Sequence, residues 1–376
     1  MIGLSLLVCF LFNQQYELDW MKLQITRICN LSCSYCSQAN WKDQTSVDLD
    51  LLKKQVIDRI SVRLLIITGG EPMCVFDELI ALIRYCKQRN IEIGIFSNAT
   101  LINEEKAKLL KEAGTDWVRV SINGPNADIH ELSYPDNTFD KTIHGIKCLT
   151  KHGIITKVRS TVSKSNINHI ENIVELVKSM GIKELDFRPY LLLGDCNPHE
   201  SYTLDRDDIL NALSVLMYLQ KSEKEIRIKL LPNWFDFLFR DLFGNSIKMP
   251  IEECHCGKQY IYIDSAGNYR ACAGHRKLLG NYHEMTVDNV WNNSAFLNEI
   301  RNYSQPEFCR ICPYHIQCHR SNCHLINFEF DNAFDQVNKT CLLYLTDKLD
   351  SRKAFDTLRN DFISHYNKVN KGRAQL

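Results

Sequence analysis

Three cysteines stand close together near the start of the sequence, and their number is the first indication of chemistry. Cys29, Cys33 and Cys36 are separated by three residues and then by two. Three thiolates can hold three irons of a 4Fe–4S cluster and leave the last iron open to a substrate or cofactor, whereas a fourth thiolate would close the coordination shell. A zinc site that borrows a distant fourth ligand, or three unrelated core cysteines, would show the same spacing. The trio alone leaves these explanations open.

A short glycine-rich segment follows the next predicted strand and favours the cluster. Gly69, Gly70, Glu71 and Pro72 stand together there. Two glycines at the end of a strand let the backbone come close to a ligand, and the carboxylate of Glu71 can accept a hydrogen bond from an ammonium group. Alone, such a segment is most often a turn. One strand-helix unit after the cysteine trio, it predicts a ligand site built from both segments.

The elements that must position these residues alternate short β-branched runs with amphipathic helices. Strands are predicted at 22–28, 63–68, 91–97, 117–122, 154–162 and 183–190, and helices at 48–60, 76–90, 103–114, 139–153 and 168–181. Because parallel strands need right-handed crossovers, this series predicts a parallel sheet wrapped by helices. The units are fewer than a closed barrel requires, so an open partial barrel and a doubly wound sheet both fit. In either fold, ligands bind at the carboxyl ends of the strands, where the trio lies.

The remainder of the chain follows a different pattern. Further helices are predicted at 205–221, 233–243 and 343–370. The expected domains are an N-terminal extension (1–20), the strand-helix core (21–200), a helical connection that completes it (201–250), a cysteine-rich domain (251–345), and a C-terminal helix and tail (346–376). The apolar run at 1–12 lacks a basic n-region and is too short to cross a bilayer, so we expect a strand or an upstream start there instead of a signal peptide.

Composition and charge restrict the partners. The 45 basic residues balance the 45 acidic ones in a chain of 376 residues, so no overall field would attract nucleic acid or an anionic membrane. We therefore expect a small or peptidic partner and a cytoplasmic location. Most of the 16 cysteines fall into two dense groups, which suits metal clusters better than scattered disulfides. The others are read as small buried hydrophobic residues: Cys9, Cys74, Cys86, Cys148 and Cys196.

The second cysteine group has room for more than one metal site. Its first part surrounds Ser265, Ala266 and Gly267, whose pattern predicts a β-hairpin with Cys256 and Cys272 at its open end. The thiols of this group are Cys254, Cys256, Cys272, Cys309, Cys312, Cys318, Cys323 and Cys341. A zinc ribbon is the simplest alternative, but one zinc ion uses only four thiolates. The group suffices for two fully ligated iron–sulfur clusters.

The first half of the chain resembles the radical S-adenosylmethionine (SAM) enzymes. The likeness rests on C-x3-C-x2-C after the first strand, "TGGEP" after the second, "FSNATLI" after the third and "VSINGPNADIH" after the fourth. It implies a partial (βα)6 TIM-like barrel of the α/β class, in which the trio binds a 4Fe–4S cluster and the SAM amino and carboxylate groups take the open iron. The implied SAM contacts are Tyr35 near the adenine, Glu71 with Gly69, Gly70 and Pro72 at the amino group, and Asn98, Ser121 and Arg159 at the ribose or carboxylate. Asn123 stands where the family usually has Asp, and no general base is assigned.

The second cysteine group resembles the SPASM extension carried by some radical SAM enzymes. The order of its cysteines matches, although the gap before Cys323 is four residues and not three. The resemblance implies that Cys254, Cys256, Cys272 and Cys323 ligate a first auxiliary 4Fe–4S cluster, and that Cys309, Cys312, Cys318 and Cys341 ligate a second. If Cys254 is not a ligand, the first auxiliary cluster has an open iron where a substrate could bind. Three clusters and SAM are thus the expected cofactors.

The resemblance also limits the reaction. SPASM-bearing enzymes mostly modify peptides or proteins, so we expect a thioether or carbon–carbon crosslink in a ribosomally made peptide, with an external donor such as flavodoxin or ferredoxin supplying electrons. A formylglycine-forming sulfatase maturase and a carbohydrate or aminocyclitol dehydrogenase are the alternatives. Ala273 occupies the position where the formylglycine enzymes have their Asp base. A non-catalytic metal scaffold is the alternative from a different class, and no separate leader-binding domain is expected. His130, Tyr190, Asp195 and Glu200 are left without a role.

Overall fold

The computed structural model describes most of the chain. It covers residues 16–36, 44–191, 202–232, 234–240, 242–243, 254–302, 306–321, 341–347 and 350–371, with the backbone alone for 319–321 and 351. Three predicted features lie outside the described residues: the apolar run at 1–12, Cys323, and the pair Asp195 and Glu200. Two cysteines read as buried, Cys9 and Cys196, also lie outside them.

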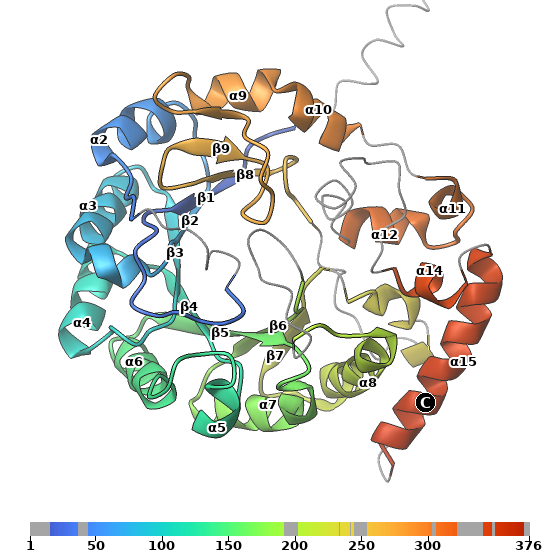
Figure 1. Cartoon of the computed structure of the whole chain (residues 1–376). Coiled ribbons are helices and arrows are strands. Elements are labelled where there is room, and N and C mark those ends of the chain that lie inside the picture. The colour runs from blue at the N-terminus through green and yellow to red at the C-terminus, as the bar shows by residue number, and fades with distance from the viewer. Residues whose placement is uncertain are drawn as a thin grey trace, which may run out of the picture.

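One curved sheet forms the centre of the molecule. Its first strands are β1 (Trp20–Gln24), β2 (Leu64–Thr68), β3 (Glu92–Ser97), β4 (Trp117–Ser121), β5 (Ile155–Val162), β6 (Glu184–Pro189) and β7 (Arg227–Leu230), which lie side by side in chain order and run parallel. The helices between them cover its outer face, as Figure 1 shows. The α/β partial barrel is therefore confirmed, although β7 was not predicted. Its four residues alternate charged and apolar and are too few to mark a strand in the sequence.

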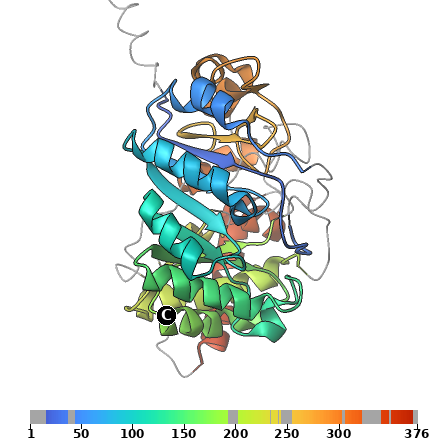
Figure 2. The ribbon, with the colours of Figure 1, turned by 90° about the vertical axis from the view of Figure 1, so that its left-hand side faces the viewer.

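Apart from the short helix α5, which was not predicted, the helices of the barrel follow the predicted positions. They are α2 (Leu49–Leu52), α3 (Phe76–Lys87), α4 (Glu104–Ala113), α5 (Ala127–His130), α6 (Phe139–Lys151), α7 (Ile170–Ser179) and α8 (Arg206–Ser222), with a π-helical turn η1 (Lys53–Ile57) and 3-10 turns η2 (Pro72–Val75) and η3 (Ile167–His169). Asn103 caps α4 at its start, and Gly114, in the left-handed conformation, ends it. Figure 2 faces the side on which α3, α4 and α6 lie in front of the strands.

Two predicted helices are wrong. The described part of 233–243 forms only short 3-10 turns, among them η4 (Asp236–Leu238), because Phe235 has a φ of 58°, which an α-helix cannot include. The helix predicted at 343–370 is two helices, α14 (Leu342–Thr346) and α15 (Ser351–Val369). The Asp350 side chain accepts hydrogen bonds from the N–H groups of Arg352 and Lys353 and so begins a new helix. α15 packs against α8 and α14.

The predicted hairpin is confirmed, and it joins the barrel sheet. Strands β8 (Tyr260–Ile263) and β9 (Asn268–Arg270) are antiparallel around Gly267, and β10 (Gly280–Asn281) follows. β8 also pairs with β1 in parallel, so the sheet order is β10-β9-β8-β1-β2-β3-β4-β5-β6-β7. The cysteine-rich region is therefore continuous with the barrel. Its helices are α9 (Val287–Asn293), α10 (Ala295–Arg301), α11 (Glu307–Arg310) and α12 (His315–Ser321).

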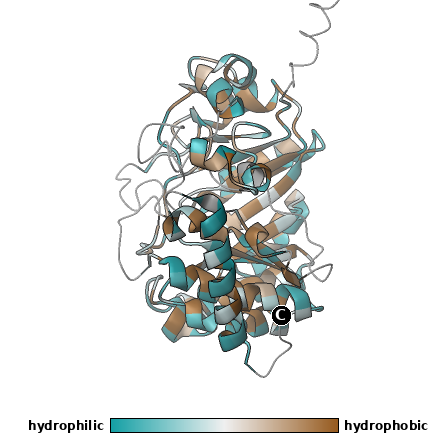
Figure 3. Cartoon of the chain, turned by 90° about the vertical axis from the view of Figure 1, so that its right-hand side faces the viewer, coloured by the Kyte–Doolittle hydropathy of each residue, from teal (hydrophilic) through white to brown (hydrophobic). Residues whose placement is uncertain are grey.

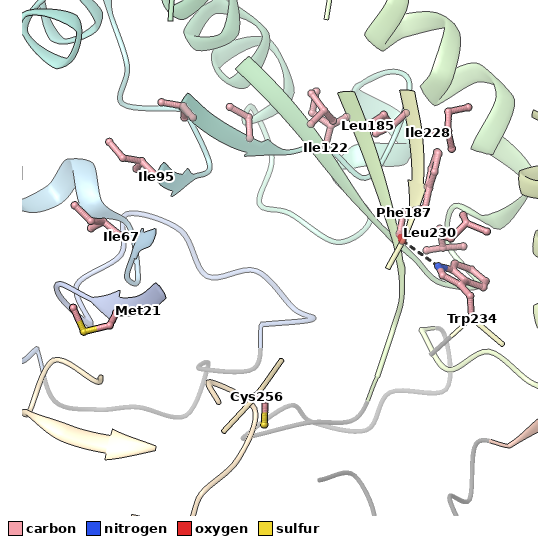
Figure 4. Close-up of a cluster of buried hydrophobic side chains, with 14 of the residues drawn as sticks. Met21, Ile67, Ile95, Ile122, Leu185, Phe187, Ile228, Leu230, Trp234 and Cys256 are labelled. Atoms are coloured by element: carbon pink, nitrogen blue, oxygen red, sulfur yellow. Dashed lines mark hydrogen bonds between the residues drawn. The ribbon is translucent and has the colours of Figure 1, made fainter. Parts of the chain in front are cut away.

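The hydrophobic core lies between the sheet and its outer helices. Met21, Ile67, Ile95, Ile122 and Leu185, from successive strands or just beyond their ends, are all buried there (Figure 4). The helices on the opposite side of the molecule combine hydrophobic and hydrophilic residues around their circumference, as Figure 3 shows. None of the helices in the described part of the chain has the length and hydrophobicity needed to cross a bilayer. Burial of the outer face leaves the inner face of the strands for polar side chains, which alternate with the apolar ones.

Candidate active site

The cysteine trio lies in the loop that follows β1, at the carboxyl end of the sheet. Cys29 is exposed, and Cys33 and Cys36 are partly exposed. Burial and then the neighbouring thiols of Cys36 and Cys29 raise the pKa of Cys33, so the three side chains lie close to one another. The Ser34 hydroxyl is 2.6 Å from the Tyr202 hydroxyl, which holds the loop against a distant segment. Burial keeps these thiols protonated when no metal is bound. Iron binding would displace the protons, so three thiols gathered in this way are suited to hold a cluster.

The two glycines of the second segment let the chain pass close to this loop. The Gly70 N–H donates to the Thr26 carbonyl at 2.7 Å, and the Glu71 N–H donates to the Ile28 carbonyl at 2.8 Å. A Cβ atom on Gly70 would lie 2.3 Å from the Ile28 oxygen. The glycines were expected to let the backbone approach a ligand. The space beside Gly70 is instead taken by the backbone that leads into the trio.

Glu71 is a buried carboxylate with a nearly complete set of donors. Its Oε1 accepts from the Ser97 hydroxyl at 2.7 Å and from the Met73 N–H at 3.1 Å, and its Oε2 accepts from the Asn98 N–H at 2.7 Å. Burial raises its pKa, while these three donors oppose the shift. A carboxylate has about four acceptor positions, so one position on Oε2 is left for a further donor.

Asn98 ties the end of β3 to the cysteine loop. Its side-chain amide donates to Asn30 Oδ1 at 3.1 Å, and its Oδ1 accepts from the Thr100 hydroxyl at 2.7 Å. The next residue, Ala99, has a φ of 60° in the left-handed region that favours glycine. Two of the predicted SAM-binding residues, Glu71 and Asn98, are thus brought together beside the trio.

A tyrosine that the sequence did not single out connects two other predicted residues. The Tyr134 hydroxyl forms a hydrogen bond with the Tyr35 hydroxyl, and it also interacts with the Ser121 hydroxyl. The Tyr134 ring stacks on His130 with centroids 4.2 Å apart. Tyr134 lies four residues after His130, just beyond the short helix α5, and only the fold places it beside the cysteine loop. No local pattern could have marked it.

His130 and Asn123 support this wall of the site. His130 Nδ1 accepts from the Asn123 N–H at 3.2 Å, and burial lowers the pKa of His130 to about 4. Asn123 Oδ1 accepts from the Thr161 N–H at 3.0 Å, and its amide donates to the Ser133 hydroxyl at 3.2 Å. An amide serves both bonds, whereas an Asp carboxylate could not donate the second. The Asn that departs from the usual Asp therefore has a structural use.

Arg159 extends from β5 into the interior of the sheet. Its Nη2 lies 3.1 Å from Asp186 Oδ2, and it is the register neighbour of Ser121. Burial, followed by the nearby guanidinium of Arg119, lowers the pKa of Arg159 to about 10. Arg159 and Ser121 are therefore adjacent at the same end of the sheet.

The first three thiols of the second group meet at the open end of the hairpin. The Cys256 thiol hydrogen-bonds Cys254 and Cys272, which raises the pKa of Cys256. Cys256 is buried, and its two neighbours are partly exposed. The structure thus brings Cys254, whose role as a ligand the sequence left open, to the same place as the other two.

The later thiols form another group. Burial and the thiols of Cys341 and Cys312 raise the pKa of Cys309 to about 12. Cys312 and Cys341 are buried, and Cys318 lies nearby in sequence on α12. Among the described residues, no set of three His, Cys, Asp or Glu side chains is gathered as a single metal ion would require.

Cys74 is the cysteine that sequence reasoning misjudged. Cys86 and Cys148 are buried, as predicted, but Cys74 is partly exposed. Burial and then the nearby carboxylate of Glu71 raise the pKa of Cys74. The Cys74 thiol in turn contributes to raising the pKa of Cys29, so it lies near both residues. Its position in the turn after Pro72 was the available signal. Whether this thiol is a fourth ligand decides whether the trio's cluster has an open iron.

The hairpin contacts the segments on both sides of the trio directly. Asp264 is fully buried and lies 3.0 Å from Arg270 Nη2 and 3.6 Å from Arg27 Nη2. The Thr45 and Ser265 hydroxyls are 2.8 Å apart. The two cysteine regions, which are more than 200 residues apart in the sequence, therefore share one polar junction.

Two family models match the chain. The Radical SAM superfamily model matches residues 23–177, and the SPASM model, an iron-sulfur cluster-binding domain, matches residues 254–313. The first includes the trio and the glycine-rich segment, and the second includes the hairpin and the thiols up to Cys312. These domains imply 4Fe–4S clusters and SAM binding.

Individual relatives cover most of the chain. An AdoMet-dependent heme synthase of Methanosarcina barkeri is 25% identical over 311 residues, which are 78% of this chain and 88% of the relative. A cysteine-type anaerobic sulfatase-maturating enzyme of Clostridium novyi is 25% identical over 320 residues, with 78% and 84% covered. The crystal structure of Streptococcus suis SuiB bound to the precursor peptide SuiA has a TM-score of 0.71 and 18% identity, with 87% of this chain and 76% of that chain covered. This likeness concerns the fold.

Proposed function

We propose that this chain, which carries a radical SAM domain followed by a SPASM domain, oxidatively modifies a peptide by abstracting one of its hydrogen atoms. The observation that carries the proposal is the gathering of three partly exposed thiols next to Glu71, at the carboxyl end of a partial barrel. When bound, the cluster supplies the electron that splits SAM into methionine and a 5′-deoxyadenosyl radical.

The residues of the barrel end would hold and orient SAM. Cys29, Cys33 and Cys36 would bind three irons, and the free acceptor position of Glu71 would receive the SAM amino group. Asn98, Ser121 and Arg159 would contact the ribose or carboxylate, and Tyr35, fixed by Tyr134, would lie near the adenine. The surrounding side chains would have to exclude water from the reaction, as a reactive radical requires.

The second cysteine region would serve electron transfer. We assign Cys254, Cys256, Cys272 and Cys323 to one auxiliary cluster and Cys309, Cys312, Cys318 and Cys341 to another, which makes three clusters in all. Hydrogen abstraction leaves a substrate radical, and a net oxidation needs an acceptor for the second electron. Buried clusters suit that role. An external flavodoxin or ferredoxin would supply the first electron.

A peptide substrate is supported by the relatives. SuiB was crystallised with a precursor peptide, and the Clostridium novyi enzyme matures sulfatases. The formylglycine reaction is less well supported because Ala273 cannot act as a base. Heme synthesis is the second candidate, because the Methanosarcina barkeri heme synthase matches 78% of this chain, the same share as the sulfatase-maturating enzyme.

Anaerobic reconstitution and co-expression test the proposal. Three clusters correspond to about twelve irons per chain, and the reduced protein should cleave SAM. Co-expression with short peptides encoded beside the gene should give a product with a mass loss of two hydrogen atoms for each crosslink formed. Absence of SAM cleavage in a protein with full iron content would contradict the enzyme assignment. SAM cleavage without any modified peptide would support the radical SAM reaction but contradict a peptide as the substrate.

A further inference from the structure

The interior of the barrel is lined by charged side chains. The inward-facing residues of β1 and β3 to β7 include Lys22, Phe96, Arg119, Lys157, Arg159, Glu184, Asp186, Arg188 and Lys229. Three of these cations lie close to the Phe96 ring. The distances to the ring centroid are 4.9 Å for the Lys22 ammonium, 4.8 Å for the Arg159 guanidinium and 5.4 Å for the Arg119 guanidinium. Cations therefore outnumber carboxylates in this set, and each cation needs a counter-charge.

Four of these cations already have a carboxylate partner. Arg119 and Arg159 lie 3.0 and 3.1 Å from Asp186. Glu184 lies 3.4 Å from Lys229, 3.5 Å from Lys157 and 3.1 Å from Arg119. These pairs join β6 to β4, β5 and β7, and they account for both carboxylates. Ion pairing therefore gives these four cations a structural role.

Lys22 and Arg188 have no such partner. In the described part of the chain, no carboxylate lies within ion-pair distance of either side chain, and the Phe96 ring is the only cation-binding group found at Lys22. Burial, then Arg159 and Arg188, lower the pKa of Lys22 to about 7, so the two cations lie near each other in a poorly solvated place. Like charges in such a place repel, and a bound anion would relieve that repulsion.

The position of the two cations fits a substrate. Lys22 lies close to Arg159, which belongs to the proposed SAM site, and also close to Cys272 of the hairpin. Arg188 also lies close to Cys272, because it contributes to lowering the pKa of that thiol. Both cations therefore lie between the trio's end of the barrel and the second cysteine region. A molecule held there would be within reach of both.

We propose that Lys22 and Arg188 bind a carboxylate of the substrate, so that this site takes acidic molecules. The guanidinium of Arg188 can hold a carboxylate through two hydrogen bonds, and Lys22 can add a third. The inference rests on the proposed function, since it concerns the substrate of the same site. The carboxylate can come from an acidic residue of a peptide or from a propionate of a tetrapyrrole.

Balancing the negative charge of the neighbouring auxiliary cluster is the competing explanation for the two cations. It predicts a different result, because a counter-ion of the cluster would change the reduction potential of that cluster and leave carboxylate binding unaffected. Substitution of the cations separates the two explanations.

The test measures binding to the reconstituted, oxidised protein with SAM present. The probes are a pentapeptide with a central glutamate, the same peptide with glutamine, and coproporphyrin III. We expect either the glutamate peptide or the porphyrin to bind. If the glutamate peptide binds, the glutamine peptide should bind at least about tenfold more weakly. Lys22→Met and Arg188→Met should each weaken binding by about tenfold or more. Whichever carboxylate probe binds identifies the source.

Controls keep the result interpretable. Lys229→Met removes a paired cation from the same interior and should change binding less than about twofold. Lys22→Arg retains the charge and should keep most of the affinity of the unmodified protein, which shows that binding depends on the positive charge, and an unchanged circular dichroism spectrum of Lys22→Met excludes a folding defect. Failure of both carboxylate probes to bind, equal binding by Lys22→Met, or a shift of cluster potential with unchanged binding would overturn the inference. SAM cleavage by the unmodified protein, measured in parallel, tests the proposed function separately.

Discussion

The two cysteine regions differ in burial and in how they are held. The trio stands in a loop, with Cys29 exposed, and its support comes from side chains such as Tyr134 and from the glycine-rich segment. In the second region, Cys256 precedes strand β8 and Cys272 follows strand β9 of the barrel sheet. Cys256, Cys312 and Cys341 are buried, and the remaining described thiols of this region are partly exposed. An accessible metal site can meet a second molecule, whereas a buried one can only exchange electrons. The contrast supports the proposal that the reaction takes place at the first region and electron transfer at the second.

The largest effect is expected from replacing one cysteine of the trio, which tests the difference between the two regions. Cys33→Ala should abolish SAM cleavage, because two thiolates do not retain the cluster, while the iron of the second region stays. Cys74→Ala is the matched control and should leave cleavage within about twofold, because Cys74 does not bind iron in this account. Iron content and methionine release measure both. Equal loss in the two variants would make Cys74 a fourth ligand.

The junction between the regions should carry the next largest effect. Asp264→Asn leaves Arg27 and Arg270 opposite a neutral side chain in a buried setting, where losing one partner costs about 3–5 kcal/mol. We expect the free energy of unfolding to fall by that order, with the trio's cluster lost along with the hairpin's.

A surface ion pair provides the control for the junction. Glu104→Gln removes an exposed partner of Lys151 and His152, and the free energy of unfolding should fall far less than in Asp264→Asn because solvent screens exposed pairs. If denaturation shows similar losses for Asp264→Asn and Glu104→Gln, the junction does not couple the regions.

Acid should weaken the wall behind the trio. The pKa of His130 is lowered to about 4 by burial, so between pH 6.5 and 4 the unfolded chain binds a proton that the folded chain does not. This contribution to stability is present in full above pH 6.5 and is lost as the pH falls toward 4. From pH 8 to 5.5 the loss amounts to about 1 kcal/mol.

Urea denaturation of the unmodified protein and of His130→Gln at both pH values measures this contribution. The amide of the variant still offers an acceptor to the Asn123 N–H but does not titrate. The unmodified protein should lose about 1 kcal/mol more than the variant on acidification. The same pH dependence in both proteins would mean that folding does not lower the pKa of His130.

Much of the site could be predicted because its signals are local. The spacing of Cys29, Cys33 and Cys36, the segment before Pro72, and the hairpin turn at Gly267 each lie within a few residues. The contributions of Tyr134 and Tyr202 could not be predicted, because they depend on which loops the barrel brings together. For the same reason the sequence showed a hairpin but not its pairing with β1.

The smallest effect concerns the backbone beside Asn98. Ala99 has a left-handed φ of 60°, which costs a residue with a side chain about 1–2 kcal/mol. Ala99→Gly loses a buried methyl group but removes this strain, so the free energy of unfolding should change by less than about 0.5 kcal/mol. Ala113→Gly, in the last turn of α4, should cost about 1 kcal/mol. Thermal denaturation that shows equal losses would mean that Ala99 is not strained.

The central claim is that the exposed trio leaves one iron open for SAM, and electron paramagnetic resonance tests it most directly. The reduced protein is measured before and after SAM is added, together with Cys33→Ala and Cys74→Ala. We predict that SAM changes the cluster spectrum of the unmodified protein and of Cys74→Ala, and leaves that of Cys33→Ala unchanged. A spectrum of the unmodified protein that does not respond to SAM would contradict the account.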